Sequence, residues 1–297
     1  MNRWWVYQRE RFPLFAHGPL IAAFSASAVG YSALLRGGRP AAFSFVVAFL
    51  VSLGSFLLLR IADEFKDAAD DARYRPYRPV PRGLVQLREL AVIGVAVALL
   101  QLLLALAIGA PLAGLLAVTW LYFLLMSREF FARRWLRARP VAYLLSHMLI
   151  MPLIDWFATG CDWVRAGAGM PDGLSWFLAA SFCNGLVIEL GRKIRAPGQE
   201  EPGVETYSAL WGRPAAVGAW LAALTATLGC ALAAAHRIGF MAPLASVLAV
   251  LFAGAAGWSI RFLATPRPGL ARGLEAWAGA WTLGLYVTLG LVPLFVR

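Results

Sequence analysis

The feature that most limits the fold of this chain is a series of apolar stretches, each about as long as a lipid bilayer is thick. A transmembrane α-helix needs about 20 consecutive, mostly apolar residues. Nine segments meet this rule, at 13–35, 40–59, 90–109, 111–127, 140–160, 173–190, 214–235, 240–262 and 274–296. Proline or glycine stands near most of their ends, as expected of helix boundaries. The sequence predicts an all-α integral membrane protein, a nine-transmembrane-helix bundle forming a single domain over residues 1–297.

Composition agrees with a lipid environment. Hydrophobic residues make up 60% of the chain and charged residues 14%, whereas a soluble domain carries about 25% charged residues. The net charge of +11 would suggest nucleic acid in a soluble protein. Here the basic residues lie in short loops between apolar runs, so we expect membrane lipid as the surroundings and no nucleic-acid partner. The three scattered cysteines indicate neither a disulfide framework nor a zinc site.

Basic residues are unevenly divided between the loops. If the N-terminus is cytoplasmic, the charged loops at 60–88, 127–139, 191–213 and 261–272 are cytoplasmic too, and few arginines remain on the other side. The positive-inside rule therefore predicts a cytoplasmic N-terminus and a C-terminus on the opposite side. We expect segment 13–35 to be a retained span rather than a signal peptide, in a bacterial inner membrane.

The loop RIADEFKDAADDARYRPYRPVPRG, residues 60–83, is unusually charged for so apolar a chain. Asp63, Asp67 and Asp71 recur every four residues, so on a helix their carboxylates project from one face, with Glu64 on its flank. Like charges at this spacing repel each other. Carboxylates so arranged suit Mg²⁺, which bridges one or two carboxylates to substrate phosphates. The pattern predicts a metal site.

Arginines follow these acids in the same loop. Arg78 and Arg82 offer guanidinium groups that match phosphate oxygens, and the neighbouring prolines keep the segment extended. The loop as a whole therefore predicts a metal–diphosphate site. The alternative is a solvated loop of mixed charge that only sets membrane orientation.

This segment resembles the first signature of the UbiA superfamily of intramembrane prenyltransferases. That signature is Asn/Asp-Asp-x-x-Asp-x-x-x-Asp at the end of the second helix, followed by Arg-Pro-x-x-x-Gly. The run from Asp63 to Asp71 is similar, with Asp for the leading Asn and Glu for the next Asp, and Arg78-Pro79 and Gly83 follow. The resemblance implies Mg²⁺ as cofactor and transfer of an isoprenyl group from a polyprenyl diphosphate to a small-molecule acceptor.

The second acidic motif of the family is altered here. The segment NGLVIELGRKIRAPGQEEPGVETYSALWG, 184–212, ends like the family's motif but holds no aspartate. Glu189 stands near the first acidic position, and Arg192 and Lys193 follow it. This favours fewer metal ions and direct contacts of Arg192 and Lys193 with the diphosphate. Alternatively, Glu189 is an interfacial residue neutralised by its basic neighbours.

Ionisable groups inside a membrane are costly and mark functional sites by default. Asp155 lies within the fifth span, where Pro152 should loosen the helix. Asp155 is a candidate for orienting the acceptor or for general base catalysis, and Asn184 is a candidate site-lining group beside Glu189. The alternative for Asp155 is a hydrogen bond to a neighbouring helix.

Two further side chains remain open to either interpretation. His147, two turns before Asp155, lines the same cavity or is a core histidine. Arg128, at the end of the fourth span, reaches the diphosphate or pairs with Glu129.

Together these features predict a Mg²⁺-dependent intramembrane prenyltransferase. The alternatives are an enzyme of the same fold that acts on a phosphate substrate without an allylic donor, a relative that only binds polyprenyl phosphate, and a polytopic transporter. A transporter would place charges deep in several helices, whereas here they concentrate at one face of the membrane.

Overall fold

The computed structural model describes residues 2–296, and their regular structure is helical throughout. Nine spans within these residues are long and apolar enough to cross a membrane, which confirms the predicted all-α bundle. They are α2 (Leu14–Leu35), α3 (Ala42–Lys66), α5 (Leu87–Ile108), α6 (Ala110–Ser127), α8 with α9 (Pro140–Trp163), α10 (Leu174–Arg192), α12 (Arg213–Arg237), α13 (Met241–Ala264) and α14 with its continuation (Pro268–Val296).

Two of the spans are interrupted. The fifth consists of α8 (Pro140–Met148) and α9 (Ile150–Trp163), with a break at Leu149. Pro152 explains the break, because it has no N–H to donate to the Met148 carbonyl and its ring clashes with that carbonyl. The last span consists of α14 (Pro268–Tyr286), a π-helical turn (Val287–Leu291) and α15 (Val292–Val296).

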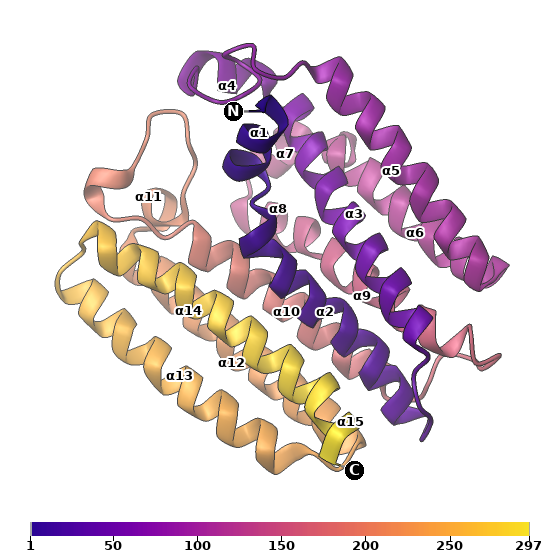
Figure 1. Cartoon of the computed structure of the whole chain (residues 1–297). Helices are drawn as coiled ribbons and strands as arrows, with labels where there is room; N and C mark the ends of the chain where they lie inside the picture. The colour runs from indigo at the N-terminus through magenta and orange to yellow at the C-terminus, as the bar shows by residue number, and fades with distance from the viewer. Residues whose placement is uncertain (1, 297) are drawn as a thin grey trace.

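Short helices gather with the long loops at one end of the bundle, uppermost in Figure 1. They are α1 (Arg3–Arg11), α4 (Ala68–Tyr74), a 3₁₀ turn (Glu129–Phe131), α7 (Arg133–Arg137), a second 3₁₀ turn (Pro197–Gln199) and α11 (Tyr207–Trp211). Three of the predicted charged loops, at 60–88, 127–139 and 191–213, carry these short helices.

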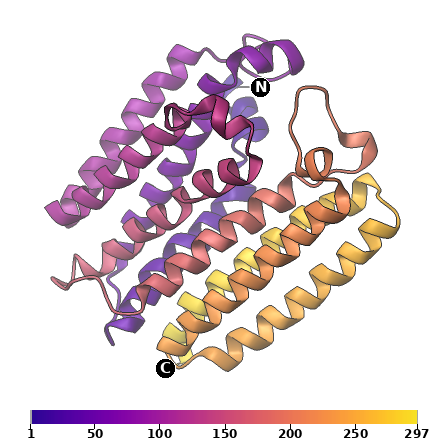
Figure 2. The ribbon, with the colours of Figure 1, turned by 180° about the vertical axis from the view of Figure 1, so that it is seen from behind.

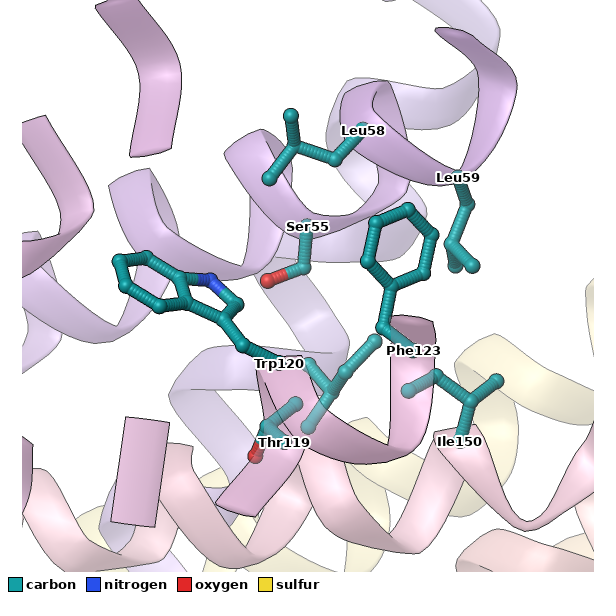
Figure 3. A pocket seen from close by; sticks show the side chains of 8 residues that line it. Ser55, Leu58, Leu59, Thr119, Trp120, Phe123 and Ile150 are labelled. Atoms are coloured by element: carbon teal, nitrogen blue, oxygen red, sulfur yellow. The ribbon is translucent and has the colours of Figure 1, made fainter. Parts of the chain in front are cut away.

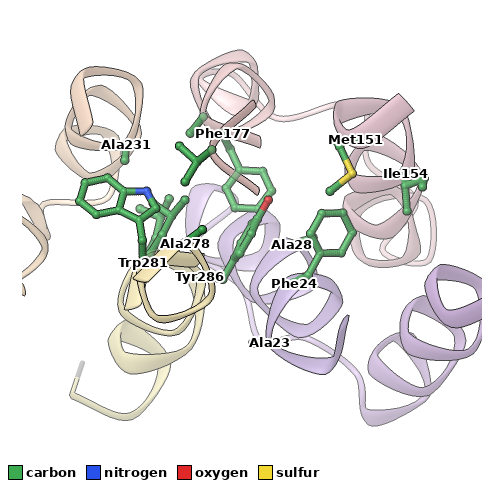
Figure 4. Close-up of a cluster of buried hydrophobic side chains, with 14 of the residues drawn as sticks. Ala23, Phe24, Ala28, Met151, Ile154, Phe177, Ala231, Ala278, Trp281 and Tyr286 are labelled. Carbon is green, nitrogen blue, oxygen red and sulfur yellow. The ribbon is translucent and has the colours of Figure 1, made fainter. Parts of the chain in front are cut away.

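Helix α9 lies at the centre and packs against α2, α3, α6 and α10, and α10 packs in turn against α12 and α14. The α5–α6 hairpin and the α13–α14 hairpin lie on opposite flanks (Figures 1 and 2). Aromatic side chains fill the middle of the bundle, as Figure 4 shows. The ring of Tyr286 meets Phe24 and Phe177 edge to face, with centroids 5.2 and 6.0 Å apart.

The first span packs directly against the last. A Cβ atom on Gly30 of α2 would collide with the carbonyl oxygen of Gly290 in the π-helical turn, and a Cβ on Gly290 would collide with Ser27. Glycine at both positions lets the two backbones touch, as small residues do in membrane helix pairs.

Candidate active site

The acidic motif begins on a membrane helix. Helix α3 continues to Lys66, well past the predicted end of the span at residue 59, so Asp63 belongs to the helix. Asp67 separates α3 from α4, yet the helical hydrogen bonds continue: Asp67 N donates to Asp63 O at 2.8 Å and Asp71 N donates to Asp67 O at 2.7 Å. The carboxylates do not share one exposed face, because the Asp63 side chain is 51% exposed and that of Asp71 is 2% exposed.

Glu64 and Asp71 form a buried cluster with arginines. Arg11 of α1 donates a hydrogen bond to Glu64, and its Nη2 lies 4.0 Å from Asp71 Oδ2. Arg75 Nη2 and Arg78 Nη1 lie 2.6 and 2.7 Å from the Asp71 carboxylate. Two of the four acids predicted to hold metal are therefore neutralised by protein cations. Arg78, predicted to bind diphosphate, is engaged in the same cluster.

Asp63 and Asp67 together are paired with fewer cations than Glu64 and Asp71. Asp63 lies 3.4 Å from Arg60, on the same helix. Asp67 makes no ion pair among the described residues. Burial raises the pKa of Asp67 above its ordinary value, and the negative charges of Asp63 and Asp71 raise it further. A cation placed beside Asp67 would relieve this repulsion.

No three His, Cys, Asp or Glu side chains come together as a metal site in residues 2–296. Mg²⁺, however, usually takes only one or two carboxylates, with substrate phosphates and water completing its octahedron. Asp63 and Asp67 match that smaller donor set in chemistry and in charge. The residues thus fit Mg²⁺ brought together with a diphosphate better than Mg²⁺ held by four carboxylates.

The end of α10 faces this pair of acids. Glu189 lies 2.5 Å from Arg192 and 2.9 Å from Lys193, and its side chain is 13% exposed. Arg192 and Glu189 both act electrostatically on Asp63. The fold therefore brings the two motifs together, and the second motif contributes a carboxylate with two cations attached to it.

Lys66, which lies between Asp63 and Asp67 in the sequence, was not among the predicted site residues. Lys66 Nζ donates to Tyr143 Oη at 2.7 Å and lies 2.9 Å from Glu129 Oε1. Glu129 also lies 3.6 Å from Arg133. The predicted Arg128–Glu129 pair is not formed, and Arg128 is exposed at the end of α6. An acid two residues after the end of a span, as at 129, is the only sequence signal for this cluster.

Loops from distant parts of the chain meet above the motif. Arg82, predicted to bind diphosphate, lies 3.0 Å from Glu10 and donates to the carbonyl of Tyr77 at 2.8 Å. Tyr77 Oη donates to Glu201 at 3.1 Å, which joins the loop after α4 to the loop after α10. These contacts join the N-terminal helix, the loop after α4 and the loop after α10 at the acidic end of the bundle.

Asp155 and Asn184 lie deep in the bundle. Both are fully buried: Asp155 accepts a hydrogen bond from Tyr286 Oη at 3.1 Å, and Asn184 accepts one from Thr282 Oγ1 at 3.2 Å. Asn184 precedes the end of α10 at Arg192 by eight residues, about 12 Å along the helix. The contacts match the alternative of hydrogen bonding to a neighbouring helix, and the catalytic roles stay predictions.

His147 is separate from this buried pair. Its ring stacks on Tyr143, with centroids 3.8 Å apart, and its Nδ1 lies 2.9 Å from the Tyr143 carbonyl oxygen. His147 therefore belongs with the Lys66 cluster near the acidic end.

An apolar pocket lies between α3, α6 and α9 (Figure 3). It is lined by side chains of α3, α6 and α9, namely Ser55, Leu58, Leu59, Thr119, Trp120, Phe123, Ile150 and Ile154. Leu59 precedes Asp63 by one helical turn, so the pocket continues from the acids toward the membrane interior. Its volume is about 10 Å³, room for about one water molecule. A lipid tail would enter it only if these side chains moved apart.

These features define a class: a membrane-embedded helical enzyme with acids and cations at the mouth of an apolar bundle. Residues 20–274 match the model of the UbiA prenyltransferase family. The chain belongs to that family, whose members transfer prenyl groups, and is therefore a transferase.

Solved structures share the fold. The apo structure of a UbiA homologue from Aeropyrum pernix K1 superimposes with a TM-score of 0.67 at 16% identity, covering 90% of this chain and 96% of that one. A digeranylgeranylglyceryl phosphate synthase superimposes with a TM-score of 0.63 at 12% identity, covering 97% and 99%. Comparison with curated protein sequences finds no significant match.

Proposed function

We propose that this protein transfers an isoprenyl group from a polyprenyl diphosphate to a small acceptor, using Mg²⁺. The observation that carries the proposal is the position of Asp63 at the mouth of an apolar bundle, where the charge of Arg192 at the end of α10 acts on it. Asp67 follows one helical turn later, with its N–H donating to the Asp63 carbonyl. A charged diphosphate would lie at this mouth, and its lipid tail would extend along the apolar helices. The charge distribution favours a cytoplasmic position for this end, in a bacterial inner membrane.

The protein's own groups would act mainly by electrostatics. Arg192 and Lys193 lie on the Glu189 carboxylate and would donate hydrogen bonds to diphosphate oxygens. Lys66 is held by Glu129 and Tyr143 within the motif, so its charge is fixed beside the same site. Such fixed charges stabilise the negative charge that develops on a departing diphosphate.

Mg²⁺ held by Asp63 and Asp67 would supply further positive charge to the leaving group as its bond to the allylic carbon breaks. Water quenches an allylic cation, so the prenyl group would react among the apolar side chains of α3, α6 and α9 rather than at the exposed loops. A nucleophilic acceptor would then take the prenyl group.

The altered second motif supports a site with less metal. Glu189 is occupied by two cations of its own helix end, so we propose that Arg192 and Lys193 take the place of a second Mg²⁺. The same feature favours a second candidate function, an enzyme of this fold that acts on a phosphate substrate without an allylic donor. The Asp155 and Asn184 assignments belong to the first candidate only.

Binding of geranylgeranyl diphosphate, with and without Mg²⁺, tests the proposal. We expect Asp67→Asn to weaken Mg²⁺-dependent binding about tenfold or more, equivalent to about 1.4 kcal/mol. Asp70→Asn is the matched control, because Asp70 is exposed three residues further along and has only a long contact of 3.9 Å to Arg137. If geranylgeranyl diphosphate binds equally well with and without Mg²⁺, and equally well to wild type and Asp67→Asn, the proposal of an allylic donor is excluded. Binding of inorganic diphosphate alone would then support the second candidate.

A further inference from the structure

A second polar site lies at the end of the bundle opposite the carboxylates. It is an open pocket of about 500 Å³ lined by Leu35, Arg36, Pro171, Asp172, His236 and Arg237. These residues come from the C-terminal ends of α2 and α12 and from the turn before α10. Because membrane helices end at the level of the lipid headgroups, the pocket opens where headgroups lie.

One cation of this pocket, Arg36, is held in place by the buried carboxylate of Asp162. Arg36 donates through Nε and Nη2 to Asp162 at 2.9 and 2.8 Å, and Ser32 donates to the same carboxylate at 2.7 Å. The Asp162 side chain is 2% exposed. The Nη1 group of Arg36 makes no hydrogen bond in the described part of the chain, so one edge of a fixed guanidinium remains available to a ligand.

Two other charged side chains line the pocket, Arg237 and Asp172. The Arg237 side chain lies across Gly173, where a Cβ atom would come within 2.6 Å of the guanidinium Nε. Gly173, the N-cap residue of α10, has φ of 88°, so both the backbone and the space at this position favour glycine. Neither Arg237 nor Asp172 forms an ion pair with a residue of 2–296, although both line the same pocket. The same pocket therefore presents one cation and one anion that have no ion-pair partner among these residues.

We propose that this pocket binds the headgroup of a zwitterionic phospholipid that carries a primary amine. Its phosphate would accept hydrogen bonds from Arg237 and from Nη1 of Arg36, and its ammonium group would donate to Asp172. Free phosphate would leave Asp172 without a partner, and a choline headgroup has no N–H to donate. Trp176, 48% exposed on the first turn of α10, offers an interfacial ring beside the lipid chains.

Native mass spectrometry of the detergent-solubilised protein tests this pocket. The probes are phosphatidylethanolamine, phosphatidylcholine and phosphatidylglycerol with identical acyl chains, and soluble glycerophosphoethanolamine. We expect preferential retention of phosphatidylethanolamine, reduced about tenfold by Arg237→Gln. Asp172→Asn should remove the preference over phosphatidylcholine. Arg39→Gln, on the same face and outside the pocket, is the control.

Three results would overturn the proposal. The first is equal retention of the three lipids, which excludes recognition of the amine. The second is wild-type retention in both Arg237→Gln and Asp172→Asn, which excludes this pocket. The third is binding of glycerophosphoethanolamine as tightly as the lipid, which identifies a soluble phosphoester as the ligand. Thermal unfolding of each variant in the same detergent confirms that the comparison is made on folded protein.

Discussion

Arg11 donates a hydrogen bond from Nε to the carboxylate of Glu64, which lies 53 residues further along the chain. The same guanidinium lies 4.0 Å from Asp71. Both side chains of the Arg11–Glu64 pair are buried, at 8% and 1% exposure. Helix α1 is therefore attached to the acidic motif and is part of the architecture of the site.

Replacing Arg11 with Gln should destabilise the protein strongly. The change leaves Glu64 buried without its cation and weakens the neutralisation of Asp71, and breaking a buried pair in this way costs about 3–5 kcal/mol. Thermal unfolding in detergent measures the effect, with Arg9→Gln as the control because Arg9 is exposed on the same helix. The double variant Arg11→Gln, Glu64→Gln should recover part of the loss. Equal stability of the Arg11 and Arg9 variants would show that the pair is unimportant.

Removing the charge of Asp67 should stabilise the metal-free protein at neutral pH. Burial and neighbouring acids raise the pKa of Asp67, so the folded state binds this proton more tightly than the unfolded state does. Stability therefore falls as pH rises through the interval between the ordinary and the raised pKa. Asp67→Asn should unfold at a higher temperature than wild type in EDTA at about pH 7, and the advantage should shrink as pH falls toward the ordinary aspartate pKa of about 4. Wild type that is more stable than the variant without metal would contradict this.

Tyr286 should be required for stability rather than for substrate contact. Tyr286→Phe removes the hydrogen bond to the buried Asp155, at a cost of about 1–3 kcal/mol. Asp155→Asn retains an acceptor for the tyrosine and should cost less. A double-mutant cycle on unfolding measures their coupling. A normally folded Asp155→Asn variant with greatly reduced kcat would instead establish the catalytic role expected from sequence.

Phe131→Gly should stabilise the turn that presents Glu129. Phe131 has φ of 57° and is 80% exposed, so its side chain gains little packing in return for a left-handed backbone. Glycine adopts this conformation without strain, and we expect a gain of about 0.5–1 kcal/mol. The control is Phe15→Gly: Phe15 is 81% exposed but helical, and the change should cost about 0.5 kcal/mol. Losses in both variants would show that the turn is not strained by Phe131.

The spans could be predicted because each depends only on a local run of apolar residues. The helix breaks at Leu149 and Asp67 were harder to predict from the sequence, although Pro152 indicated the first. The spacing of Asp63 and Asp67 indicated a helical turn, and Asp67 N does donate to Asp63 O at 2.8 Å. Local pattern thus sufficed wherever the structure is set by neighbours in sequence.

The partners of the charged groups could not be predicted in the same way. Sequence spacing does not show that Arg11 would neutralise Glu64, or that Lys66 would reach Glu129, because these pairs depend on how separate helices pack. The same holds for Tyr286 and Asp155, which lie on α14 and α9. The sequence therefore predicts Glu64 and Asp71 as metal ligands, although their carboxylates are paired with arginines in the folded chain.

The contact between Gly30 and Gly290 also bears on how the protein is made. Residues 14–35 leave the ribosome long before residues 268–296, yet the backbone surface of the first span is complementary to the last. During synthesis that surface faces lipid or an insertion factor until the final helix enters the bilayer. A chain stopped after α13 would leave this face of α2 without its partner. An exposed Gly30 face would therefore distinguish unfinished from finished molecules to the proteases that remove misassembled membrane proteins.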